Sequence, residues 1–372
     1  MFFDFALALA LHGCAASPAD PYAGDSPPSV RVTLADAGVR DLRSQYRQAL
    51  CPRLPAAGRP CDDVLSQRFT AADTLASTAS DDYAQRYRIV FVPGYFNECF
   101  ERLWRPFADP ERELRQRGYR VDYFGVPGRG TTAENAERLA AHFAALDDDP
   151  RPIILFAYSK GVPDTLEFLV RHPEAVPRIA ALVAVASAAN GSPLADELLP
   201  TYRKWLASVP LPDCEPGTGD ASQDLRRDVR LAWWSRHRHE VTVPVFSLVA
   251  APRPERVSPT TRLLYNNLAR IELRNDGKLL ASDQIVPGGY LLGYVNADHS
   301  DIVNGASADV PGVGSVFADD VPRVALVEAA IEVVAGVLLN DRGVAAADGP
   351  GGSSRHVTLD PPNPPKVVGP PR

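Results

Sequence analysis

The chain has 372 residues, enough for one large α/β domain with additional segments. Apolar residues make up 45% and charged residues 23%, an ordinary globular balance that excludes general disorder and a membrane-embedded bundle. The net charge is −7 and no long basic run is present, so we expect no nucleic acid among its partners.

The first residues are typical of an export signal. Residues 2–11 are apolar, too short to span a bilayer as a mature helix, and of the length found in the core of a signal peptide. They lead into Leu11-His12-Gly13-Cys14, which resembles a bacterial lipobox, where the cysteine is lipidated. We therefore expect a leader over 1–14 and a membrane tether at Cys14, followed by a linker over 15–29. A buried N-terminal helix is the alternative. With the leader, we expect the protein to be exported, as a periplasmic protein, an outer-membrane lipoprotein or a secreted protein.

Beyond Cys14 the chain has four cysteines, an even number that indicates two disulfides in an exported protein. Three pairings are open. Cys51 and Cys61 flank a loop rich in proline and glycine and are the first choice, which leaves Cys99 to pair with Cys214. No Cys-x-x-Cys spacing is present and the histidines are scattered, which argues against a structural zinc site.

Between residues 30 and 345 short β-branched runs alternate with helical stretches. This pattern predicts the α/β class, with a mostly parallel sheet flanked by helices. Strands are expected at 88–92, 119–124, 152–156, 179–186, 243–250 and 290–295. Helices are expected at 133–146, 162–171 and 321–339. The whole range predicts one domain, followed by a disordered proline-rich tail over 346–372.

A stretch between two of these strands, residues 197–240, is predicted to be an inserted helical cap. It contains Trp205, Trp233 and Trp234, which could line an apolar acyl site, although such residues more often belong to a core.

The first of the expected strands ends at Pro93-Gly94, where the chain turns at the edge of the sheet. A loop at this edge can supply a main-chain N–H to a negatively charged oxygen. We identify Tyr95 as the candidate donor and Phe96 as the next choice. A plain strand-terminating turn is the alternative interpretation.

The third strand runs into Ala157-Tyr158-Ser159-Lys160-Gly161, and a helix follows. A serine on a tight turn between a strand and a helix forms a nucleophile elbow, which presents the hydroxyl above the sheet. Small residues two positions before and after the serine let the two backbones approach. Ser159 is therefore the predicted nucleophile, and the main-chain N–H of Lys160 is a second candidate oxyanion donor.

A serine nucleophile needs a base, and the base needs an orienting carboxylate. Among seven histidines, His299 alone follows a predicted strand near the end of the domain, which gives the chain order serine, acid, histidine. Asp276 and Asp283 both precede the last strand, and the residues alone leave both open as the acid. The unused one would cap a turn.

Several of these motifs resemble the α/β-hydrolase superfamily, and within it bacterial triacylglycerol lipases and related carboxylesterases. The similar segments are Gly191-Ser192-Pro193-Leu194-Ala195-Asp196, Asn275-Asp276-Gly277 and His299-Ser300-Asp301-Ile302-Val303-Asn304. The resemblance favours Asp276 over Asp283 as the acid. It also implies Asp301 as a ligand of a structural calcium ion, because the aspartate two positions after the histidine has that role in those lipases. No other cofactor is expected.

The expected function is that of a serine ester hydrolase, similar to carboxylesterases and lipases, that works through an acyl-enzyme on a small-molecule or lipid ester. An acyltransferase could use the same three residues if the cap excludes water. A third hypothesis is a surface lipoprotein that keeps the fold as a binding module without the chemistry, since fold alone does not assign function.

Overall fold

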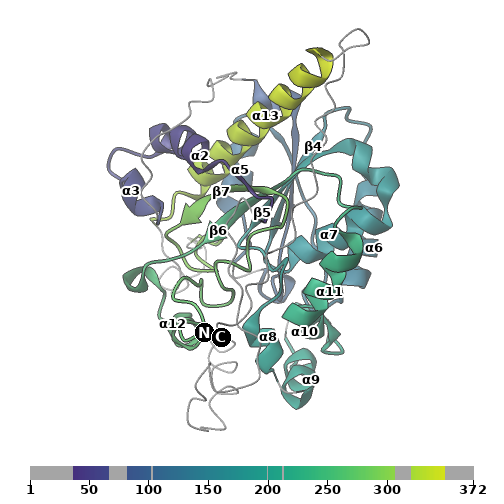
Figure 1. The fold of residues 1–372 in the computed structure, drawn as a ribbon. Helices are drawn as coiled ribbons and strands as arrows, with labels where there is room; N and C mark the ends of the chain where they lie inside the picture. The colour runs from purple at the N-terminus through teal and green to yellow at the C-terminus, as the bar shows by residue number, and fades with distance from the viewer. Residues whose placement is uncertain are drawn as a thin grey trace, which may run out of the picture.

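The computed structural model describes residues 37–66, 82–101, 104–198, 200–211, 213–305 and 320–347. The predicted leader with Cys14, the predicted linker and residues 348–372 lie outside these ranges. A seven-stranded sheet forms the centre of the described part (Figure 1). Its strands are β1 (Arg40–Asp41), β2 (Arg88–Val92), β3 (Arg120–Tyr123), β4 (Ile153–Tyr158), β5 (Ile179–Val185), β6 (Val245–Ala250) and β7 (Tyr290–Val295).

All paired strands run parallel, in the order β1-β7-β6-β5-β4-β2-β3. The six predicted strands are all present, which confirms the α/β class. β1 was not predicted, because two exposed residues carry no pattern. β4 is an interior strand that pairs with β2 on one side and β5 on the other, so the residue that follows it is flanked by the ends of both neighbours.

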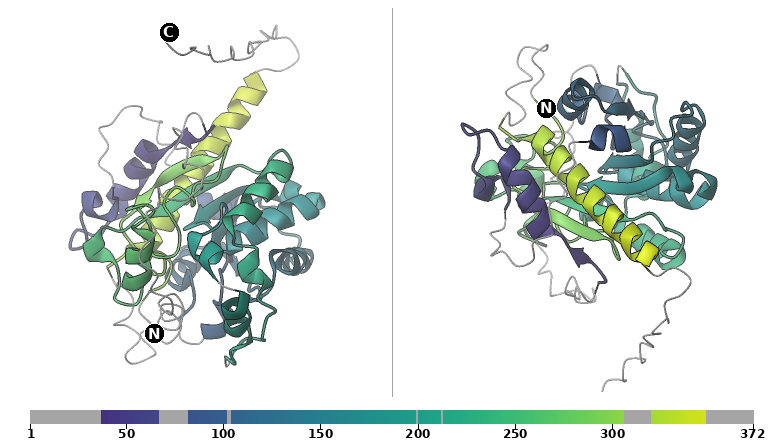
Figure 2. Two further views of the ribbon diagram at one scale, coloured as in Figure 1. Left: turned by 60° about the horizontal axis from the view of Figure 1, so that its bottom comes forward. Right: turned by 90° about the horizontal axis from the view of Figure 1, so that it is seen from above.

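Helices cover both faces of the sheet (Figures 1 and 2). They are α2 (Arg43–Leu50), α3 (Cys61–Val64), α4 (Tyr83–Arg86), α5 (Ala108–Gln116), α6 (Thr132–Ala144), α7 (Gly161–Arg171), α8 (Pro193–Glu197), α9 (Pro200–Ser208), α10 (Asp220–Gln223), α11 (Arg227–His237), α12 (Arg262–Leu268) and α13 (Arg323–Ala347). Helices α2, α5 and α13 pack on one face, and α6, α7 and α11 on the other.

Side chains alternate between the two faces along each strand, as a pleated backbone requires. On β2, Ile89 and Phe91 belong to the core beneath α2 and α13, whereas Val90 and Val92 belong to the core beneath α6 and α7. Because both faces are covered, every residue of this strand is buried. This burial explains why the strands read as continuous apolar runs in the sequence.

The region predicted as a cap contains α9, α10 and α11. Helix α11 packs against the second core through Trp233 and Trp234 and therefore forms part of the layer over the sheet. The indole N–H of Trp233 donates to Glu167 of α7, and that of Trp234 donates to the carbonyl of Ala189. Trp205 on α9 is half exposed.

Both preferred disulfide pairings are present, Cys51–Cys61 and Cys99–Cys214. They fit a protein exported from the reducing cytoplasm. Within the described ranges, none of the helices combines the length and apolar character needed to cross a membrane.

Candidate active site

Ser159 occupies a strained turn between β4 and α7. Its φ of 52° lies in the left-handed region, which a non-glycine residue rarely adopts. The turn is fixed from both sides, because the Ser159 N–H donates to the Val185 carbonyl at 3.1 Å and the Ser159 carbonyl accepts from the Val162 N–H at 3.1 Å. A Cβ on Gly161 would lie 2.2 Å from the Pro93 carbonyl oxygen, so this position requires glycine.

His299 follows β7 and lies between Ser159 and Asp276. Its Nε2 is 3.0 Å from Ser159 Oγ, and its Nδ1 is 2.6 Å from Asp276 Oδ2. With Nδ1 protonated, the imidazole donates to the carboxylate and accepts from the hydroxyl. The exposed fractions are 8% for Ser159, 2% for His299 and 0% for Asp276, so water scarcely competes for these hydrogen bonds.

Asp276 is held in an Asx-type turn. Its Oδ1 accepts from the main-chain N–H groups of Lys278 at 2.8 Å and Leu279 at 2.7 Å. Its remaining carboxylate oxygen is the one that faces His299. The same turn is stabilised by its neighbours. Gly277 adopts a φ of 89°, and its N–H donates to Asn275 Oδ1.

The second candidate acid lies elsewhere. Asp283 pairs with Arg227 at the start of α11, with 3.2 Å between Arg227 Nε and Asp283 Oδ2. Burial raises the pKa of Asp283 to about 7, against the lowering effect of Arg227. Of the two acids left open by the sequence, Asp276 alone contacts His299.

Two further residues fix the His299 loop. The Tyr158 hydroxyl donates to the His299 carbonyl at 3.0 Å, and the two rings lie 5.1 Å apart. Asp298 Oδ1 accepts from the N–H groups of Ser300 and Asp301, both at 3.0 Å, while its Oδ2 accepts from Ser258. The sequence analysis missed both residues. Asp298 had a weak local signal as an Asx-turn residue, but nothing linked Tyr158 to a carbonyl 141 positions away.

The loop after β2 brings Tyr95 to the same edge of the sheet. A Cβ on Gly94 would lie 2.9 Å from Ser159 Cβ, so the loop passes close to the serine. The N–H of Phe96, the second candidate for an oxyanion donor, already donates to the Gly128 carbonyl at 3.4 Å. Within the described part of the chain, the main-chain N–H groups of Tyr95 and Lys160 donate to no other residue.

Lys160 has a second role in the structure. Its side chain is buried, and Nζ lies 2.7 and 2.9 Å from the two carboxylate oxygens of Asp164, one turn further along α7. Asn135 of α6 also donates to Asp164, at 2.6 Å. Burial raises the pKa of Asp164, while Lys160 and Asn135 act in the opposite direction. The pair fixes the first turn of α7, which carries the Lys160 N–H.

The calcium site implied by the resemblance stays a prediction. Among the described residues, the one group of three potential ligands close enough to share a metal is Glu98 with Cys99 and Cys214, whose sulfurs are in a disulfide. Asp301 belongs to no such group of three side chains among the described residues.

The parallel sheet and the serine on a strand-to-helix turn define an α/β-hydrolase. The chain is 31% identical to the metagenomic carboxyl esterase MGS0156, over 83% of this chain and 96% of that one, with a TM-score of 0.73. It is also similar in fold to EstA from Clostridium botulinum, at 13% identity over 83% of this chain and 98% of that one, with a TM-score of 0.50. No protein-family model and no curated protein matches the sequence. The chain therefore belongs to the α/β-hydrolase family of carboxyl esterases.

Proposed function

We propose that the protein is a serine ester hydrolase in which Ser159 is the nucleophile, His299 the base and Asp276 the acid. The observation that carries the proposal is the continuous hydrogen-bond chain from Asp276 through His299 to Ser159 Oγ, at the end of β4. The 31% identity to a carboxyl esterase supports the same chemistry.

In this mechanism His299 Nε2 takes the proton of Ser159 as Oγ attacks the ester carbonyl. The main-chain N–H groups of Tyr95 and Lys160 donate to the oxyanion of the tetrahedral intermediate. His299 then gives its proton to the leaving alcohol, and an acyl-enzyme remains on Ser159. Water attacks that ester with the same base, and the acid product leaves. Asp276 keeps the proton on Nδ1 and stabilises the imidazolium.

We also propose a small-molecule or lipid ester as the substrate and export from the cytoplasm with a lipid anchor on Cys14. Membership in the carboxyl esterase family supports the substrate class. The lipobox-like segment before Cys14 and the two disulfides support export.

The test is hydrolysis of p-nitrophenyl esters and labelling by a fluorophosphonate probe. We expect wild type to hydrolyse the esters and to be labelled, and Ser159→Ala to lose both. Ser235→Ala, on the exposed side of α11, is the matched control and should keep both. Labelling or hydrolysis that survives in Ser159→Ala would contradict the proposal.

A further inference from the structure

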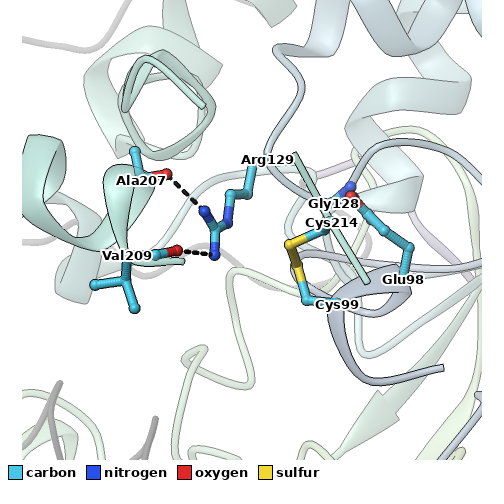
Figure 3. The surroundings of a disulfide bond; sticks show 7 residues. All are labelled: Glu98, Cys99, Gly128, Arg129, Ala207, Val209 and Cys214. Atoms are coloured by element: carbon cyan, nitrogen blue, oxygen red, sulfur yellow. Dashed lines mark hydrogen bonds between the residues drawn. A yellow bond between two sulfur atoms is a disulfide. The ribbon is translucent and has the colours of Figure 1, made fainter. Parts of the chain in front are cut away.

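The loop that carries Tyr95 is covalently joined to the region beyond α9. We call residues 93–99 the oxyanion loop and residues 207–217 the cap segment. Cys99, the middle residue of the 3-10 helix Glu98–Phe100, is bonded to Cys214 in the cap segment, 115 positions away (Figure 3). Leu211 and Cys214 pack against the small cluster of Phe96 and Cys99.

Arg129 joins the same two parts without a covalent bond. Its Nη1 donates to the Ala207 carbonyl and its Nη2 to the Val209 carbonyl, both at 2.7 Å (Figure 3). The guanidinium carbon lies 5.2 Å from the centre of the Phe96 ring, within the range of a cation–π contact. The side chain is buried, and burial lowers its pKa. Because the acceptors are main-chain carbonyls, Arg129 holds the backbone of the cap segment in place.

The cap segment closes tightly around Arg129. The Ala207 carbonyl that accepts from Arg129 also accepts from the Gly217 N–H, at 2.9 Å. A Cβ on Gly217 would lie 2.9 Å from both the Cβ and the carbonyl oxygen of Arg129, so the chain passes here at a distance that only glycine allows.

Two contacts complete the connection. The Tyr95 hydroxyl lies 2.7 Å from Ser222 Oγ of α10. Tyr95, the proposed oxyanion donor, is therefore hydrogen-bonded to the helix that follows the cap segment. On the other side, Glu98 accepts from the Gly128 N–H, which ties the oxyanion loop to the loop that carries Arg129 (Figure 3).

We propose that Arg129 and the Cys99–Cys214 disulfide are positioning residues for the oxyanion hole, an inference that rests on the proposed function. Between Gly94, which contacts Ser159, and Cys99, the oxyanion loop makes a left-handed turn at Phe96, with a φ of 61°. Tyr95 lies between Gly94 and that turn, so a shift of the turn would displace the Tyr95 N–H. Arg129 and the disulfide hold the turn from outside, and so aim the donor before substrate binds.

A purely structural role would affect stability alone, whereas a misplaced oxyanion donor weakens transition-state binding. Loss of one donor lowers kcat by ~10²–10³-fold, and displacement by ~1 Å has a cost of similar size. A positioning role therefore predicts a fall in kcat with little change in KM. It also predicts weaker inhibition by an aryl trifluoromethyl ketone, since Ser159 Oγ adds to its carbonyl, His299 takes the proton, and the resulting oxyanion occupies the hole.

The experiment compares two enzymes that each lack one of the two disulfides with Arg129 variants in the full chain. Cys99→Ser with Cys214→Ser removes the proposed positioning disulfide, and Cys51→Ser with Cys61→Ser removes the other disulfide as the matched control. Arg129→Met removes the two hydrogen bonds, and Arg129→Lys tests partial rescue. For each, kcat and KM for p-nitrophenyl butyrate and the inhibition constant of the ketone are measured well below the unfolding midpoint.

We expect kcat to fall by about 10- to 100-fold in Arg129→Met and in the Cys99/Cys214 pair, with KM changed by less than about threefold. The ketone should bind more weakly in proportion to the loss in kcat/KM. The kcat of Arg129→Lys should lie between those of Arg129→Met and wild type. The Cys51/Cys61 pair should keep kcat within about twofold, because that disulfide links two positions ten residues apart after α2 and does not bond to the oxyanion loop.

An unchanged kcat with only a lower unfolding midpoint would overturn the positioning role, while ester hydrolysis that depends on Ser159 would leave the proposed function intact. No hydrolysis by wild type, or hydrolysis that survives Ser159→Ala, would instead reject the proposed function and this inference with it. Should Arg129→Met and the cysteine variants not fold, Arg129→Lys decides. Lysine keeps the positive charge but cannot reproduce the two-pronged contact with the Ala207 and Val209 carbonyls, and an unchanged kcat in this variant would reject the proposal.

Discussion

Two hydrogen bonds join His299 to Asp276, one through side chains and one through the main chain. Nδ1 lies 2.6 Å from Oδ2, and the His299 main-chain N–H donates to the Asp276 carbonyl at 3.0 Å. The second bond fixes the distance between the two loops independently of either side chain. In the proposed mechanism the imidazole therefore finds Asp276 already in place, which limits the cost of ordering the site.

Replacing each candidate acid separately tests this relationship. Asp276→Asn keeps the shape of the turn but offers an amide to Nδ1, so we expect kcat to fall by ~10³–10⁴-fold. Asp283→Asn, beside Arg227, should change kcat by less than about threefold, since distant sites act independently. Steady-state kinetics on a p-nitrophenyl ester measures both. Equal, mild losses would mean that Asp276 does not serve as the acid.

Asp283 should make stability depend on pH. Its pKa of about 7 in the folded state lies above the ordinary value of 3.8, so the folded protein binds this proton more tightly than the unfolded chain. Between the two pKa values the stability of the fold therefore falls as pH rises. From about pH 5 to about pH 8 the wild type should lose roughly 2–3 kcal/mol relative to Asp283→Asn. Urea unfolding of both proteins at the two pH values measures the difference, and parallel pH profiles would contradict it.

The sequence predicted most of the sheet and the Cys51–Cys61 disulfide because their signals are local, and the Cys99–Cys214 pairing then followed by elimination. Buried parallel strands such as β4 appear as continuous apolar runs, and Cys51 and Cys61 flank one short loop. The order of the strands was not predicted, because it depends on long-range pairing that a single sequence does not show.

The candidate site was partly predictable because several of its residues also have local signals. Ser159, His299 and Asp276 each belong to a recognisable local motif, and chain order relates them. The choice between Asp276 and Asp283 could not be made from the residues, since both are aspartates in turns before β7. It depends on which turn faces the His299 loop, and only the fold decides that. Arg129 escaped notice because its partners, Ala207 and Val209, offer main-chain carbonyls that leave no mark in the sequence.

Gly161 should tolerate no side chain. A Cβ there would lie 2.2 Å from the Pro93 carbonyl oxygen, between the elbow and the end of β2, and neither backbone can yield without moving Ser159 or the oxyanion loop. We expect Gly161→Ala to lower the free energy of unfolding by at least about 1–3 kcal/mol and to reduce kcat. Gly125→Ala, which meets no atom within 4 Å, is the matched control and should change neither much. Thermal unfolding and ester hydrolysis together test this, and similar behaviour of the two variants would contradict it.

Tyr158→Phe should separate the orientation of His299 from the integrity of the fold. The substitution removes the hydroxyl that donates to the His299 carbonyl at 3.0 Å and keeps the ring that packs beside the imidazole. The carbonyl then loses a partner in a buried site, which costs about 1–3 kcal/mol of stability. Since that carbonyl belongs to the base itself, the His299 loop gains freedom, and we expect kcat to fall several-fold with KM nearly unchanged. Tyr265→Phe, whose hydroxyl bonds to the Leu273 carbonyl outside the site, is the matched control for the loss of a tyrosine hydroxyl. If both variants lose stability alike and neither loses kcat, Tyr158 contributes to the fold and has no part in orienting the base.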